Sequence, residues 1–158
     1  MTKNDQPSFA QTVDMLMKES DRGALLVGIA LLDDALVDLL KKLLRLDKEV
    51  LRLFDPNMPL GSFSSRIELA WSLNLINDLV RRDLHLLRRT RNDFAHRLDV
   101  LDFDTPAVGE RLRTLNIPAE VRGTPNAESP KVCFRLCLMS LYRYIMNRVE
   151  GHIPLGQE

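Results

Sequence analysis

The segment 88–97 constrains the fold more than any other part of the sequence, because it combines four arginines with a helical pattern of apolar residues. At about 100° per residue, one face of this helix holds the following apolar residues: Val80, Leu84, Leu87, Phe94 and Leu98. Arg91 falls in the middle of that face. Burying an unpaired guanidinium is costly, so the pattern predicts that a carboxylate meets Arg91 in the core.

Asp33 is the predicted partner of Arg91. It lies among apolar residues of a long predicted helix, which indicates that its carboxylate is half-buried. We therefore expect Asp33 and Arg91 to form a structural ion pair, and we assign neither of them a catalytic role.

The polar border of the arginine-rich helix is the candidate partner-binding surface, which consists of His85, Arg88, Asn92 and His96. Arg88 and Asn92 are one turn apart, and they could bind a phosphate, a carboxylate of a partner or only the neighbouring loop. His96 could bind a loop carbonyl, cap the end of the helix, where positive charge is favoured, or take part in a site. The sequence leaves these alternatives open.

The composition is typical of one globular domain, residues 1–158, with a flexible start at 1–8. Lys plus Arg and Asp plus Glu both number 22, so the chain lacks the broad positive field that favours DNA, and direct DNA binding is unlikely. Residues 1–8 lack the apolar region of a signal peptide, and the longest apolar run, 24–32, is too short to span a bilayer. We therefore expect a cytoplasmic protein.

Cofactors and metals are not expected. Cys133 and Cys137 are the only cysteines, and their spacing on a predicted helix is typical of small buried residues rather than of a disulfide or zinc site. The three histidines, His85, His96 and His152, have no cysteine or carboxylate at ligand spacing beyond what a charged helix offers by accident.

Hydrophobic periodicity predicts an all-α fold, an irregular bundle of about five main helices. The predicted main helices span 9–20, 22–46, 64–78, 81–98 and 130–151, with short helices at 49–54 and 106–115. Asp21 is the predicted cap of the second helix, and a loop at 56–61 and an extended loop at 116–129 follow from their prolines and glycines. Met139 and Met146 lie off the main apolar stripe of the last helix and are predicted to mark a subunit contact.

Four segments of the sequence resemble the mannitol operon repressor family, in the same order and spacing: 19–23, 31–36, 60–66 and 83–96. The resemblance covers most of the chain. It implies an all-helical, bacterial, cytoplasmic transcriptional repressor with no recognisable helix-turn-helix, in a family that also contains paralogues not tied to mannitol.

The residues agree with the implied lack of a DNA-reading module. Helix-turn-helix recognition needs an exposed helix whose first residues reach base edges after a short turn, and we find no such pair. Asp83 and Asp93 also lower the net positive charge of the arginine-rich helix. We therefore expect a regulator, not an enzyme, that acts through contacts with another regulatory or phosphotransferase-system protein, as a monomer or weak homodimer.

A second resemblance suggests an alternative function. The segment from Arg91 to His96 fits the arginine and histidine spacing of the HEPN superfamily, small helical dimers that include ribonucleases. In those enzymes the two residues are thought to stabilise the phosphate and transfer protons. The alternative is thus a HEPN-like ribonuclease or RNA-binding protein that uses Arg91 and His96.

Overall fold

The computed structural model describes residues 9–16, 18–44, 47–96 and 101–151, and these ranges contain helices but no strand. The α-helices are α1 (Phe9–Leu16), α2 (Asp21–Lys41), α3 (Lys48–Leu51), α4 (Phe63–Ser72), α5 (Asp78–His96), α6 (Pro106–Arg113) and α7 (Pro130–Val149). Two 3-10 helices are η1 (Arg52–Phe54) and η2 (Pro125–Glu128). The all-α prediction is confirmed. No helix in these ranges is both long and apolar enough to cross a bilayer.

Side-chain caps set where most of the longer helices begin. Ser20, Ser62 and Ser129 accept hydrogen bonds from the backbone three residues later at the starts of α2, α4 and α7. The predicted cap of the second helix was therefore wrong by one residue. Asp21 instead accepts a hydrogen bond from the Phe103 backbone at 2.8 Å and pairs with Lys131.

Two predicted helices are shorter than their apolar patterns suggested. The α2 helix ends at Lys41 rather than at residue 46, and Leu43, which follows it, is 46% exposed. The α4 helix ends at Ser72 because Asn74 adopts a left-handed conformation, with φ of 55°, and Asn77 then caps α5. Leu73 lies in this turn and is exposed.

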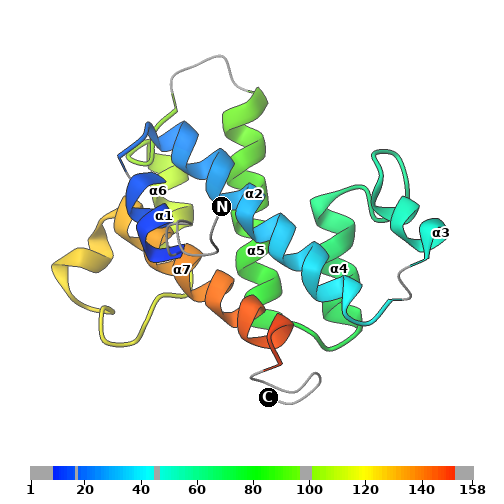
Figure 1. The fold of residues 1–158 in the computed structure, drawn as a ribbon. Helices are drawn as coiled ribbons and strands as arrows, with labels where there is room; N and C mark the ends of the chain where they lie inside the picture. The colour runs from blue at the N-terminus through cyan, green and yellow to red at the C-terminus, as the bar shows by residue number, and fades with distance from the viewer. Residues whose placement is uncertain (1–8, 17, 45–46, 97–100, 152–158) are drawn as a thin grey trace, which may run out of the picture.

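The α2 helix is the centre of the bundle. It crosses α5 in Figure 1 and packs most extensively against α7, with α4 and α1 also in contact. Gly28 allows the close approach of α2 and α7, because a Cβ there would lie 3.0 Å from Leu138 and 3.2 Å from Phe134. Phe134 also packs against Phe103, which in turn contacts Phe94 of α5. These aromatic contacts join α5, α7 and the segment before α6.

Both cysteines are buried in α7, as predicted. The Cys133 thiol donates a hydrogen bond to the Ala127 carbonyl at 3.2 Å. Burial raises the pKa of the Cys137 thiol well above its usual value, and the nearby Asp83 carboxylate adds to this effect. Both cysteines therefore serve as small core residues.

Arg66, and not Arg91, is the partner of Asp33. Arg66 Nη1 donates to both oxygens of the Asp33 carboxylate at 2.7 and 2.8 Å, and its Nε donates to the Leu60 carbonyl at 2.8 Å. The two side chains are 12% and 26% exposed, so Asp33 is half-buried as predicted. The ion pair joins α4 to α2 and fixes the end of the loop 55–61. A Cβ at Gly61 would lie 2.5 Å from the Asp55 carbonyl oxygen, so only glycine fits at this position of the loop.

Arg91 is exposed, so the prediction that it is buried and paired with Asp33 was wrong. The cause is the unequal length of two neighbouring helices. The α4 helix has 10 residues and α5 has 19, so the C-terminal turns of α5 extend past α4 (Figure 1). Val80, Leu84, Leu87 and Phe94 are buried as predicted, whereas Leu98 lies outside the described residues.

The connection between α6 and α7 is only partly the extended loop predicted at 116–129. The α6 helix begins with Pro106, as predicted, and ends at Arg113 rather than at residue 115. Turns follow at 119–123, and η2 occupies Pro125–Glu128. Gly123 adopts φ of 77°, which a residue with a side chain rarely adopts.

Replacing Arg66 with alanine should lower the free energy of unfolding by about 2–3 kcal/mol, less than for a fully buried pair because 26% of the Asp33 side chain is exposed. The matched control, Arg91→Ala, should stay within about 0.5 kcal/mol of the wild type. Urea unfolding followed by circular dichroism measures both. A larger loss in Arg91→Ala than in Arg66→Ala would contradict the assignment of the ion pair.

Candidate functional site

The α5 helix presents a basic face to solvent, on the side opposite its buried stripe. We define the basic face as Arg81, Arg82, His85, Arg88, Arg89, Asn92 and His96. Its first part borders a surface cavity of about 460 Å³, lined by Asp78 and by Arg81, Arg82, His85, Arg88 and Arg89. All four residues of the predicted partner-binding surface lie on this face, and the structure brings His85 and Arg88 together at the same cavity.

Glu68 of α4 holds two residues of the basic face in place. It accepts hydrogen bonds from Arg81 at 3.1 and 2.7 Å, and His85 Nε2 lies 2.6 Å from its Oε1 atom. The hydrogen bonds from Arg81, and then the contact with His85, lower the pKa of the Glu68 carboxyl below its usual value. Glu68 therefore fixes the direction of these two side chains and offsets part of the charge of Arg81.

Trp71 lies at one end of the basic face. The Arg81 guanidinium lies 4.0 Å from the centroid of the Trp71 ring, a cation–π contact. The ring nitrogen of Trp71 donates to Asp78 at 2.7 Å. The indole and the guanidinium thus form one continuous surface that joins α4 to the start of α5.

The remaining residues of the basic face are less constrained. Arg88 is partly buried, and its Nε atom has no hydrogen-bond partner within the described ranges. Arg89 is exposed, Asn92 is half-buried one turn beyond Arg88, and His96 is exposed at the last residue of α5. Binding of a partner by His85, Arg88, Asn92 and His96 stays a prediction, as do the alternatives for His96.

The two acidic residues expected to offset the charge of the arginines do not contact Arg88 or Arg89 within the described residues. Asp93 pairs with Arg111 of α6 at 2.6 Å. Asp83 is 1% exposed, and it accepts hydrogen bonds from Arg82 and from the Asn116 backbone at 2.9 Å. The positive charge of Arg88 and Arg89 is therefore not offset by either carboxylate.

Asp83 is the structural residue that sequence reasoning missed. Its position gave a signal, because Asp83 shares the spacing of three and four residues that joins Val80, Leu87 and Phe94 on the buried stripe. A carboxylate on such a stripe indicates a buried polar contact. The groups that satisfy it are the preceding Arg82, the Asn116 backbone 33 positions further along and the Cys137 thiol, and they do not follow from that spacing.

The fold is similar to that of a protein of known structure. The structure matches MtlR in the X-ray structure of the MtlR–HPr complex from Escherichia coli with a TM-score of 0.67 and 20% sequence identity, over 85% of this chain and 98% of that chain. No family model and no curated protein matches the sequence. The match shows a shared fold, which agrees with the fold implied by the resemblance to mannitol operon repressors.

Arg91 and His96, the residues of the HEPN-like alternative, both lie exposed on the C-terminal turns of α5. Five positions on a helix separate two side chains by about 140° around the axis. One copy of the chain therefore does not direct both side chains at a single point. Within the described residues, no group of three or more histidine, cysteine or acidic residues could hold a metal ion.

An apolar groove of about 830 Å³ runs along α7, where the predicted subunit contact lies. Met139 and Met146 line it, together with Tyr142, whose ring stacks on Phe9 at 3.6 Å. Both methionines are partly buried against the core. Contact with a second copy stays a prediction.

Replacing Glu68 with glutamine should reduce stability most at neutral pH. The lowered pKa of Glu68 means that its contribution to folding is present above the usual value of 4.5 and is lost as the pH falls below it. The difference in free energy of unfolding between the wild type and Glu68→Gln should therefore shrink in acid. The control is Glu49 of α3, which is exposed. The free energy of unfolding of Glu49→Gln should match that of the wild type at every pH. If the loss of unfolding free energy in Glu68→Gln did not change with pH, the assigned contacts of Glu68 with Arg81 and His85 would be contradicted.

Proposed function

We propose that this protein is a transcriptional regulator of a mannitol-utilisation operon, or a paralogous regulator, that acts through protein contacts with a carrier protein of the phosphotransferase system. The similarity to MtlR in its complex with HPr carries this proposal. The sequence resemblance to mannitol operon repressors supports it independently of the fold.

The basic face of α5 is the proposed docking surface. Arg88 and Arg89 make no ion pair within the described residues, so their charge is available to a partner. Arg81 and His85 are held by Glu68, so they lose little freedom on binding. Arginine beside an aromatic ring is typical of the residues that dominate protein interfaces. This chemistry favours a partner surface that carries carboxylates or backbone carbonyls.

Repression without direct reading of DNA is part of the proposal. The chain is neutral overall, so any attraction to DNA depends on the basic face alone. The first turn of α5 carries the acidic Asp78, whereas a recognition helix uses its first turns to contact DNA. The partner, or a DNA-bound activator, would provide the link to the operator.

The docking surface can be tested by titrating the protein with the HPr-type carrier from its own organism in a calorimeter. Arg88→Ala combined with Asn92→Ala should weaken binding by about tenfold or more, because arginines at interfaces commonly contribute more than 1 kcal/mol. Arg52→Ala removes an exposed arginine from η1 and should leave the affinity unchanged. Equal losses in both variants would contradict the assignment of the surface, and the absence of binding to the wild type would contradict the proposed partner.

A ribonuclease remains the second candidate, and one observation favours it. Burial of Arg91 in the core was the argument against a role for this residue in a surface site, and Arg91 is exposed. The two residues would need a second copy, or the RNA itself, to bring them to one phosphate.

Incubation of the purified protein with single-stranded RNA distinguishes the two functions. A regulator should leave the RNA intact. Cleavage by the wild type that is lost in both Arg91→Ala and His96→Ala, with unchanged thermal melting, would make the ribonuclease the better assignment. Arg89→Ala is the control for a general loss of RNA binding, since it removes an equally exposed arginine from the same helix.

A further inference from the structure

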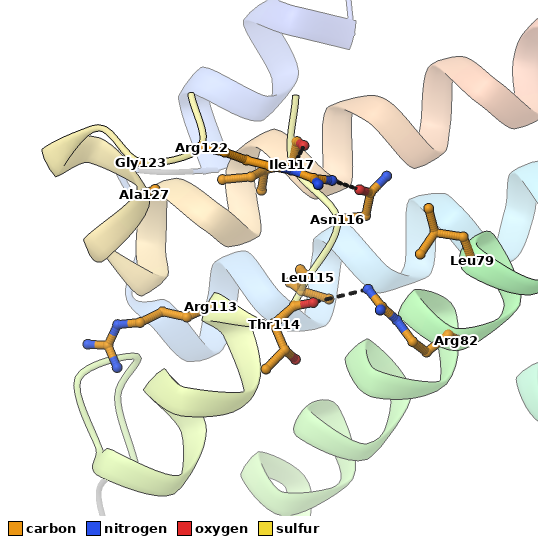
Figure 2. Close-up of a pocket in the computed structure, with 10 residues that line it drawn as sticks. All are labelled: Leu79, Arg82, Arg113, Thr114, Leu115, Asn116, Ile117, Arg122, Gly123 and Ala127. Carbon is orange, nitrogen blue, oxygen red and sulfur yellow. Dashed lines mark hydrogen bonds between the residues drawn. The ribbon is translucent and has the colours of Figure 1, made fainter. Parts of the chain in front are cut away.

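A second cavity lies on the other flank of α5, between the start of that helix and the connection from α6 to η2 (Figure 2). Its volume is about 430 Å³, which is in the range of small-molecule sites. Three arginines line it, Arg82, Arg113 and Arg122, and no acidic side chain does. It is separate from the cavity of the basic face, although Arg82 borders both.

The buried carboxylate of Asp83 holds one wall of this cavity. Asp83 Oδ1 accepts from Arg82 Nε and Nη2 at 3.0 and 2.7 Å, and Oδ2 accepts from the Asn116 backbone at 2.9 Å. Arg82 Nη2 also donates to the Thr114 carbonyl at 3.0 Å. The segment 114–116 is thereby fixed to α5, and the Arg82 guanidinium is fixed at the cavity.

Arg122 is also fixed at the cavity. Its Nε donates to the Ile117 carbonyl at 3.1 Å, and its Nη2 donates to the Asn116 side chain. Figure 2 shows Arg122 directed at Asn116 and Arg82 directed at the Thr114 carbonyl, at two points along the same segment. The Nη1 atoms of both arginines make no hydrogen bond within the described residues, so each has donors left for a ligand.

Arg113 differs from these two arginines. Its Nε donates to the Glu128 carbonyl at 2.9 Å, and Figure 2 shows its side chain directed away from Arg82 and Arg122. Arg113 therefore adds positive charge at the rim. Leu79 and Ile117 complete the lining with apolar surface.

We propose that this cavity binds a small phosphate monoester, so that the protein senses a phosphorylated metabolite as well as a protein partner. Arginines with free donors bind phosphate oxygens in a charge-assisted geometry. Both arginines are held before the ligand arrives, so little side-chain freedom is lost on binding. Leu79 and Ile117 would contact the carbon part of the ligand. The inference does not depend on the proposed protein partner, because it rests on a different cavity.

Calorimetric titration of the full chain with glycerol 3-phosphate, inorganic phosphate and glycerol tests this proposal. Glycerol 3-phosphate should bind at millimolar concentration or below, inorganic phosphate should bind more weakly, and glycerol should not bind. Arg122→Gln should weaken the binding of glycerol 3-phosphate by about tenfold, because it removes a charge-assisted hydrogen bond. Arg82→Gln should do the same, although its melting temperature must be checked because Asp83 loses one of its hydrogen-bond partners.

Arg52→Gln is the matched control, since it removes an exposed arginine of η1 that lines neither this cavity nor the cavity of the basic face. It should leave the affinity unchanged. A loss equal to that of Arg122→Gln would show diffuse attraction to positive charge and would overturn the proposal. Binding of glycerol as strong as that of glycerol 3-phosphate, or no binding of either phosphate compound at millimolar concentration, would overturn it as well.

Discussion

The ion pair between Arg66 and Asp33 determines how the first half of the molecule is arranged. A charged group inside a helical bundle must meet an opposite charge or several hydrogen-bonding groups. Arg66 supplies both kinds of contact, because it binds the Asp33 carboxylate and the Leu60 carbonyl. Once α4 is fixed to α2 in this way, the short turn at 73–77 determines where α5 begins. The position of the basic face thus depends on a contact that the preceding helix makes with α2.

The helices themselves could be predicted from the sequence because their signals are local. Apolar spacing, proline and serine caps gave α5, α6 and α7 with ends correct to within a few residues. The partner of Asp33 could not be predicted in the same way. Arg66 and Arg91 both lie on or near an apolar stripe, and the choice between them depends on how far α4 extends along α5. That extent is a property of the packed bundle.

One of the two candidate sites could likewise be predicted from the sequence, and the other depends on how the helices pack. The basic face could be predicted because one helix carries it, from Arg81 to His96. The cavity between Arg82 and Arg122 could not, because its walls come from two segments that Arg82 and Asp83 join over 32 and 33 positions of the chain. The α5 helix thus has a protein-binding candidate on one flank and a ligand-binding candidate on the other. Arg82 borders both, so it is the shortest structural link between them.

Trp71 is the only tryptophan of the chain, and it lies where α4 meets the basic face, with Arg81 over its ring. The emission of an indole depends on the charges and the water around it. Intrinsic fluorescence excited selectively at the indole therefore arises from this one corner of the molecule. A macromolecule that settles on the α5 surface should shift the emission spectrum, so that the native chain reports its own association without any attached dye.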